Sequence, residues 1–241
     1  MLTMEENMVV EKMDIRSVSA PKFSEKLYRS WFMRKLVGLS WWFMNRLDGR
    51  RDKKICGFSL AKYVPSKFRQ SMGATGSQAT RYWILEDIFQ GAQFSEDDRV
   101  IDIGCGKARV FAYLTEQGVR CHMHGVELNE EVASIAQKWC GKYPNISISS
   151  GDAFQIDYND YSVLLLGRPF ELPMLGRFIK KLEQELTRPV TIFIWSDQET
   201  GETLDGRAGW TLNRRGWVFR KRGLWVSRSP QRYSVWRYDP T

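Results

Sequence analysis

A glycine-rich turn between a short hydrophobic segment and a following helix carries the clearest chemical signal in the sequence. Residues 100–108 read Val-Ile-Asp-Ile-Gly-Cys-Gly-Lys-Ala. Gly104 and Gly106 have no Cβ, so the backbone there can come close to a ligand. The helix that follows begins with amide groups that lack intrahelical acceptors, and these favour an anionic or polar group. The turn therefore predicts a ligand-binding loop.

Two acidic residues follow the next two predicted strands. Glu127 ends the segment 122–127, and Asp152 follows the segment 146–149 within Gly-Asp-Ala-Phe at 151–154. A carboxylate at the first position can accept hydrogen bonds from both ribose hydroxyls. Asp152 can accept from an adenine amino group while Phe154 covers the ring. Each motif alone also fits a structural turn, a surface acid or a helix cap, but their order and spacing together predict one cofactor site.

Together these motifs resemble those of the class I S-adenosylmethionine-dependent methyltransferases. The resemblance covers roughly residues 77–200 and rests on the turn, on Gly-Val-Glu-Leu at 125–128 and on the segment 151–154. It implies S-adenosylmethionine as the cofactor. The glycine-rich turn would lie beside the methionine and ribose portions, the segment 125–128 would bind the ribose, and the segment 151–154 would hold the adenine. The implied cofactor-binding residues are Asp102, Gly104, Cys105, Gly106, Glu127, Leu128, Asp152, Ala153 and Phe154.

A nicotinamide-dependent dehydrogenase is the nearest competing interpretation. Such enzymes usually carry G-x-G-x-x-G after the first strand, and Arg109 stands where the third glycine belongs. An acid two positions before the first glycine, Asp102, also suits the methyltransferases better. In that family the segment before the first strand often contributes to the site, so Thr75, Thr80 and Tyr82 are second-rank candidates.

The loop after the fourth predicted strand departs from the family pattern. Many amino-methylating members carry Asp/Asn-Pro-Pro-aromatic there, whereas this chain has Leu-Gly-Arg-Pro-Phe at 166–170. No Asn or Asp supplies the carbonyl that would orient a target amine, which disfavours an adenine-N6 or glutamine-type methylase. Arg168, Pro169 and Phe170 are the candidate substrate contacts, with Arg168 directed at an anionic substrate or at solvent.

The sequence indicates neither a catalytic residue nor a metal site. Methyl transfer from a sulfonium depends on the position of the nucleophile and the exclusion of water, and positioning can lower a barrier by about 7–11 kcal/mol. A missing general base is therefore compatible with an enzyme. His122 and His124 are the only histidines, and they are expected to pack in the core or at an edge.

Strands and helices that alternate along the chain are expected to position these motifs. The sequence predicts strands at 99–103, 122–127, 146–149, 161–166 and 190–195, and helices at 77–91, 109–117, 129–140 and 172–186. Such βαβ units predict an α/β fold with a doubly wound, mostly parallel sheet, which is Rossmann-like. Segments 210–221 and 233–238 alternate without a helix between them, which predicts C-terminal antiparallel strands that close the sheet.

Residues 1–75 are expected to form a basic, helical N-terminal extension to a methyltransferase domain at 76–241. Apolar residues recur at three to five positions over 24–47, which predicts a helix, and the charged segment 47–54 predicts a break. The extension is a candidate lid or substrate-recognition segment. Its most apolar stretch, 36–44, has nine residues, and a bilayer span needs about 20. We expect its aromatic face to pack on the main domain, and peripheral membrane contact is the less favoured alternative.

The net charge of +8 is concentrated at the two ends of the chain. It is +5 over residues 1–55, −3 over 56–200 and +6 over 201–241. Basic ends fit an anionic partner, although solvated surface charge is the simpler explanation. In the C-terminal strands, basic residues are interleaved with Trp217, Trp225, Tyr233 and Trp236, a composition that could bind phosphates and stack bases. Because such aromatic residues more often form core, a nucleic-acid acceptor is not the favoured interpretation.

The cysteine pattern and the N-terminus bear on the compartment. Four cysteines without a C-x-x-C pair indicate neither a disulfide framework nor a zinc site, and the first residues lack a secretory signal. We therefore expect a cytoplasmic S-adenosylmethionine-dependent methyltransferase. The alternative is a non-catalytic protein that uses this fold as a scaffold, with its basic flanks on nucleic acid or another anionic partner. The sequence determines neither the methyl acceptor nor the oligomeric state.

Overall fold

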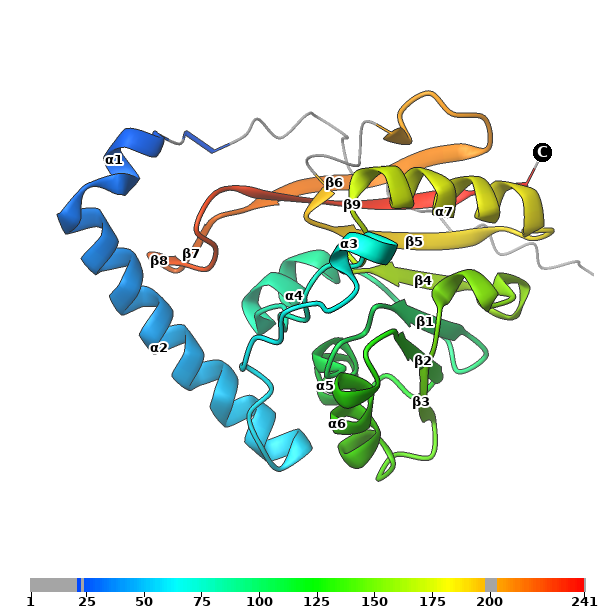
Figure 1. The fold of residues 1–241 in the computed structure, drawn as a ribbon, viewed down its shortest axis with the longest axis horizontal. Coiled ribbons are helices and arrows are strands. Elements are labelled where there is room, and N and C mark those ends of the chain that lie inside the picture. The colour runs from blue at the N-terminus through cyan, green and yellow to red at the C-terminus, as the bar shows by residue number, and fades with distance from the viewer. Residues whose placement is uncertain (1–20, 23, 198–202, 241) are drawn as a thin grey trace, which may run out of the picture.

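A seven-stranded, mostly parallel sheet forms the centre of the protein (Figure 1). The computed structural model describes residues 21–22, 24–197 and 203–240. Strands β1 to β5 run parallel, and β9 pairs antiparallel with both β5 and β6. The order across the sheet is β3 (Ile146–Ser150), β2 (His122–Glu127), β1 (Arg99–Ile103), β4 (Val163–Leu166), β5 (Val190–Trp195), β9 (Gln231–Tyr238) and β6 (Trp210–Val218). The predicted fold class is confirmed, including the antiparallel closing strands.

Two hydrophobic cores lie on the two faces of this sheet. One core contains α4 (Tyr82–Ile88), α5 (Arg109–Glu116) and α6 (Glu130–Cys140), and the other contains α7 (Leu172–Glu185) with the short turns η1 (Ala153–Gln155) and η2 (Tyr158–Asp160). Successive strand residues point to opposite faces, so Val100 belongs to the first core and Ile101 to the second. The nearly continuous apolar strands of the sequence are therefore buried on both sides, as in other parallel sheets.

The N-terminal helix is longer than predicted. After the short α1 (Glu25–Arg29), α2 (Trp31–Cys56) continues through the segment 47–54, where the sequence predicted a break. That prediction was wrong because the charges lie on two faces of one helix. Asp48 and Asp52 are four residues apart and buried, whereas the neighbouring basic residues Arg50, Lys53 and Lys54 are exposed.

The aromatic residues of α2 also differ from the expectation that they pack on the main domain. Trp31, Phe32, Trp42 and Phe43 are all exposed. Only Trp41 is half-buried. The inward face is instead taken by the two acids and their neighbours, because buried arginines of the main domain neutralise those acids. Within the described ranges, no helix is both long and apolar enough to cross a membrane.

Residues 73–80 form an extended segment, which we call the strap, in place of the start of the helix predicted at 77–91. It follows α3 (Arg69–Met72), and helical structure resumes only at α4. Bridges join Val64 to Ser77 and Ala74 to Phe170. Backbone groups that pair with other segments are not available for helical hydrogen bonds, which explains the shorter helix.

The aromatic residues of the C-terminal strands mostly belong to the core. Trp225, Tyr233 and Trp236 are buried. β6 leads through a small hairpin, β7 (Arg220–Lys221) and β8 (Leu224–Trp225), into β9. Arg214 donates to backbone carbonyls of α4 and of the turn after it. Three of the four aromatic rings considered for base stacking are therefore used for packing.

Candidate functional site

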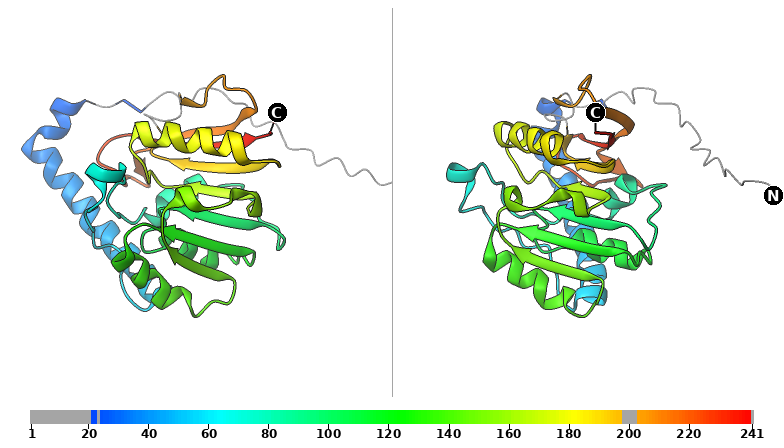
Figure 2. Two further views of the ribbon diagram at one scale, coloured as in Figure 1. Left: turned by 45° about the vertical axis from the view of Figure 1, so that its right-hand side comes forward. Right: turned by 90° about the vertical axis from the view of Figure 1, so that its right-hand side faces the viewer.

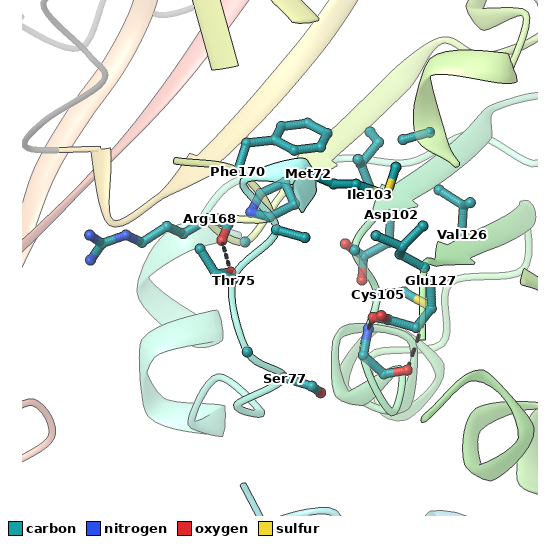
Figure 3. Close-up of a pocket in the computed structure, with 18 of the residues that line it drawn as sticks. Met72, Thr75, Ser77, Asp102, Ile103, Cys105, Val126, Glu127, Arg168 and Phe170 are labelled. Carbon is teal, nitrogen blue, oxygen red and sulfur yellow. Dashed lines mark hydrogen bonds between the residues drawn. The ribbon is translucent and has the colours of Figure 1, made fainter. Parts of the chain in front are cut away.

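A cavity of about 380 Å³ opens at the carboxyl ends of β1, β2 and β4 (Figure 3). Strand order reverses between β1 and β4, which is where open α/β sheets bind ligands. The structure brings every predicted cofactor and substrate residue to this cavity: Asp102, Gly104, Cys105, Gly106, Glu127, Leu128, Asp152, Ala153, Phe154, Arg168, Pro169 and Phe170.

Two glycines of the β1–α5 loop give the cavity its floor. Gly104 has a φ of +71° and Gly106 a φ of +57°, conformations that strain residues with a side chain. A Cβ on Gly104 would lie 2.7 Å from the Cβ of Pro169, and one on Gly106 would lie 2.6 Å from the Oγ of Ser77. The loop therefore needs glycine both for its conformation and for space between the cavity walls.

Glu127 and the glycine loop hold each other in place. Oε2 of Glu127 accepts a hydrogen bond from the amide of Gly106 at 2.9 Å, and Oε1 accepts one from the amide of Asn129 at 2.9 Å. The amide of Gly104 donates to the carbonyl of Val126 at 2.9 Å. Burial raises the pKa of Glu127, and the backbone amides act in the opposite direction. The carboxylate is thus oriented before any ligand arrives.

Asp102 is the most buried acid among the described lining residues, with only 3% of its surface exposed. Burial, together with the nearby charge of Glu127, raises the pKa of Asp102 to about 8. No described residue donates a hydrogen bond to its carboxyl group. Figure 3 shows this group on the cavity side of β1, facing the gap between the glycine loop and the strap. Asp102 therefore offers an unused acceptor in a dry position.

An aromatic wall stands beside Asp152 at the end of β3. Oδ1 of Asp152 accepts from the amide of Phe154 at 2.9 Å, so this acid caps η1. The ring of Phe154 packs against Phe170, with 5.7 Å between centroids, and against Phe178, with 5.8 Å. An apolar wall next to a carboxylate suits a flat heterocycle that carries an amino group.

The strap and the β4–α7 loop are joined at the mouth of the cavity. The amide of Thr75 donates to the carbonyl of Pro169 at 3.1 Å, and its Oγ1 donates to the carbonyl of Arg168 at 2.6 Å. Arg168 has a φ of +62°, an unusual value for arginine. Its guanidinium extends away from the glycine loop (Figure 3). Backbone strain of this kind clusters at functional sites.

Several cavity residues were not predicted from the sequence. Thr75 and Thr80 line the cavity, as expected at second rank, but Tyr82 is buried behind it and donates to Asp52 at 3.0 Å. The strap, rather than α2, bounds the described part of the cavity. The only sequence signal for the strap is the turn-rich Gly-Ala-Thr-Gly at 73–76. The lining residues missed by the sequence analysis include Ser71, Met72, Ser77, Gln78, Met174 and Arg177.

A buried charge cluster fastens α2 to the helix behind the glycine loop. Arg109 donates to both carboxylate oxygens of Asp52, at 3.0 and 2.6 Å. Arg81 pairs with Asp48 at 3.2 Å. All four side chains are buried. Arg109, the residue that departs from the dinucleotide pattern, thus anchors the N-terminal helix.

Lys107 of the glycine-rich motif is also used for anchoring. Its Nζ donates to the carbonyls of Leu60, at 3.1 Å, and of Lys62. The indole of Trp139 donates to the carbonyl of Lys107 at 3.0 Å. The basic residue of this motif therefore ties the loop to the chain after α2, and its ammonium group points away from the cavity.

A second cavity, of about 470 Å³, adjoins the first at the strap. Both are lined by Thr75, Thr80 and Arg168. The guanidinium of Arg228 stacks over the ring of Trp41, 4.9 Å from its centroid. The charged residues that line the second cavity are four arginines and one acid: Arg69, Arg81, Arg168, Arg228 and Glu171. This lining therefore holds more positive than negative charge, although Arg69 pairs with Glu171 at 2.7 Å and Arg81 pairs with Asp48 at 3.2 Å.

Neither histidine lines one of these two cavities. His124 is half-buried, with Nδ1 2.6 Å from the Tyr161 hydroxyl and Nε2 2.8 Å from Oγ of Ser149. Burial lowers the pKa of His124. The expectation that the histidines pack is confirmed for His124 and wrong for His122, whose side chain is exposed at the start of β2. No cluster of three or more His, Cys, Asp or Glu residues suited to a metal ion occurs in the part of the chain that the structure describes.

Residues 100–186 match the family model described as a methyltransferase domain. The chain is 30% identical over 130 residues to the ribosomal RNA small subunit methyltransferase A of Clostridium botulinum (strain Loch Maree / Type A3), a match covering 51% of this chain and 45% of that protein. It is 29% identical over 142 residues to a protein-lysine N-methyltransferase of Saccharolobus islandicus (strain REY15A), covering 54% of this chain and 85% of that protein.

The fold is also found in a solved structure of low sequence similarity. The crystal structure of TrmN from Thermus thermophilus superposes with a TM-score of 0.51 at 14% identity, over 66% of this chain and 49% of that chain. At this identity the comparison shows the fold alone. The chain spans less than half the length of the ribosomal RNA methyltransferase that it matches.

Proposed function

Because residues 100–186 form a methyltransferase domain of the class I, S-adenosylmethionine-dependent family, we propose that this protein transfers a methyl group from S-adenosylmethionine to an acceptor in the second cavity. The observation that carries the proposal is the convergence of three motifs, from the ends of three strands, on one cavity. S-adenosylmethionine supplies an electrophilic methyl group on a sulfonium. The chain's own residues have to bind this cofactor, orient it and keep water away.

The described residues fit this cofactor part by part. Gly104 and Gly106 leave the β1–α5 loop without side chains where it lines the cavity, so its backbone can come close to the cofactor. Glu127 is fixed with acceptor capacity left on its carboxylate, which suits ribose hydroxyls. Asp152 and the aromatic wall suit the adenine. The buried carboxyl group of Asp102 suits the cationic methionine end.

The strap and the β4–α7 loop would position the acceptor and limit its access to water. Their shared hydrogen bonds hold Arg168 and Pro169 across the cavity mouth from the glycine loop. No base is required if the acceptor is held in line with the methyl group, because orientation supplies a large part of the rate enhancement. Catalysis by positioning agrees with the absence of a histidine from both cavities.

The cationic second cavity favours an acceptor that carries an anionic group. Arg168 and Arg228 both line it, and the guanidinium of Arg228 lies over the indole ring of Trp41. A lysine side chain would meet like charge there, whereas a phosphate or carboxylate would be attracted. A nucleotide of RNA belongs to this class of acceptor, and so does a small anionic metabolite.

Calorimetric titration with S-adenosylmethionine and with S-adenosylhomocysteine tests the cofactor assignment. We expect binding, and we expect Asp152→Ala to weaken it. Asp157→Ala is the matched control, because Asp157 caps η2 as Asp152 caps η1, through the amide two residues on at 2.9 Å, but lies outside the cavity. Folded protein that binds neither compound, or equal losses in the two variants, would overturn the assignment.

Turnover separates an enzyme from a binding scaffold. We expect S-adenosylhomocysteine to accumulate when the protein is supplied with anionic acceptors, including RNA fragments, and Arg228→Gln to raise KM for the acceptor without changing cofactor affinity. Arg237→Gln, which removes an exposed arginine on β9, is the control. Cofactor binding without turnover on any acceptor would favour the non-catalytic alternative.

A further inference from the structure

We infer that the outer face of α2 docks on an anionic membrane surface. This face consists of the residues of α2 whose side chains are exposed and lie on one side of the helix: Trp31, Phe32, Lys35, Leu39, Trp42, Phe43, Arg46, Arg50, Lys53 and Lys54. The opposite face of α2 packs on the main domain through the buried charge cluster of Asp48, Asp52, Arg81 and Arg109. The inference is independent of the proposed methyl transfer.

The outer face carries an unusual share of exposed apolar surface. Of the seven large apolar side chains that are exposed in the described ranges, five lie on it. Trp31 is 67% exposed, Leu39 is 64% exposed and Trp42 is 57% exposed. Single exposed apolar residues are ordinary, but a contiguous patch marks an interaction surface. Something that accepts apolar side chains therefore suits this face.

The charges on the outer face have one sign. Lys35 and Arg46 lie among the apolar residues, and Arg50, Lys53 and Lys54 continue the face toward the end of the helix. The two acids of α2, Asp48 and Asp52, are buried on the opposite side and paired with arginines. The exposed side chains of this helix therefore present positive charge alone, which is complementary to anionic lipid headgroups.

Individual cations of the outer face lie beside its aromatic rings. Nζ of Lys35 is 5.8 Å from the ring centroid of Trp31, and the guanidinium carbon of Arg46 is 5.1 Å from that of Trp42. Tryptophan favours the membrane–water interface, and a basic side chain can lay its apolar stem along such rings while its charge stays among the headgroups. In that position the rings enter the acyl boundary while the cations stay at the headgroups.

The placement of α2 makes the outer face accessible to a flat surface. Figures 1 and 2 show α1 and α2 along one edge of the molecule, with the first turns projecting beyond the sheet. A membrane is favoured over nucleic acid because the apolar residues, Leu39 among them, lie on a convex cylinder. Bases stack on rings that line a groove along the strand, and an aliphatic side chain gives them no such platform.

Vesicle flotation of the full chain tests the inference. We expect the protein to float with phosphatidylcholine vesicles that contain roughly one third phosphatidylglycerol and to stay behind with pure phosphatidylcholine. The double variant Trp42→Ser/Phe43→Ser and the double variant Lys35→Glu/Arg46→Glu should each reduce the bound fraction at least about tenfold. Leu172→Ser, an exposed apolar residue on α7, and Lys180→Glu, an exposed cation on α7, are the matched controls and should leave binding unchanged.

Circular dichroism and thermal melts would establish that each variant is folded. Folded wild-type protein that fails to float with anionic vesicles at low salt would overturn the inference. A second result would also overturn it: the protein binds single-stranded RNA tightly, the α2 variants abolish that binding, and no vesicle binding is seen. The outer face would then be a nucleic-acid surface. A third such result is a dimer in light scattering that the same variants dissociate, again without vesicle binding. The outer face would then contact a second copy of the chain, and the inference would be overturned.

Discussion

Replacement of Asp102 by asparagine tests whether the buried acid of the cavity meets the cationic end of the cofactor. With a pKa of about 8, this carboxyl group is about 90% protonated at pH 7 in the free protein. A cation bound beside it favours the ionised form. Binding should therefore release about 0.9 proton at pH 7, about 0.5 at pH 8 and about 0.1 at pH 9.

Calorimetry measures this release directly. Titration of S-adenosylmethionine in phosphate and in Tris at the same pH gives two binding enthalpies, and their difference divided by the difference in buffer ionisation enthalpy is the number of protons released. Asp102→Asn should release none through this group, while Asp152→Asn should behave as the wild type. Any proton that the ligand itself takes up or releases contributes equally in all three proteins, so it cancels when their proton releases are compared. Equal release in the wild type and Asp102→Asn would refute the reasoning.

The same pKa shift has a consequence for stability without a ligand. The pKa of Asp102 is raised above its value of 3.8 in the unfolded chain, so between about pH 4 and pH 8 the folded state holds a proton that the unfolded state has lost. The free energy of unfolding should therefore fall as pH rises through this window. Asp102→Asn should remove this part of the slope, which urea unfolding at several pH values would detect.

Three further predictions concern the loop, the charge cluster and the thiols. Gly104→Ala should lower cofactor affinity and should cost about 1–2 kcal/mol of stability. Gly91 has a similar φ of +72° but open space at its Cβ, so Gly91→Ala should lower stability alone. Equal cofactor affinities in the two variants would contradict this prediction. Arg109→Met should lower the unfolding free energy by about 3–5 kcal/mol, because it leaves the buried carboxylate of Asp52 without its arginine partner. Arg237→Met, which removes an exposed ion pair, should lower it by under about 1 kcal/mol. Urea unfolding measures both values. Burial raises the pKa of Cys56 to about 12, so its thiol should react with a disulfide reagent only after unfolding, and fast reaction in the native protein would argue against that burial.

Local sequence rules account well for the central sheet. The strand at 122–127 and the strand at 190–195 were predicted with the observed bounds. Asn129 caps α6 as expected, with its side chain accepting from the amide of Glu131 at 3.1 Å. These features follow from hydrophobic runs, turn glycines and caps, which act over a few residues and are therefore legible in the sequence.

The N-terminal helix shows where the same rules fail. A run of charges reads as a break when the partners of those charges are unknown. Asp48 and Asp52 have their partners at Arg81 and Arg109, which are 33 and 57 residues away. Because a pairing over such a separation exists only in the folded protein, neither the continuation of α2 nor the outward turn of its aromatic face could be predicted locally.

The sequence by itself determined the fold class and the meeting of the three motifs in one cavity, because motifs at the ends of successive parallel strands must meet at one edge of the sheet. Tertiary structure alone decided that Glu127 is held by the loop it faces, that Asp102 is dry enough for its pKa to rise, and that the strap closes the cavity beside a cationic neighbour. Burial, pairing and charge depend on which distant segments come together, and that is settled by packing rather than by local spacing.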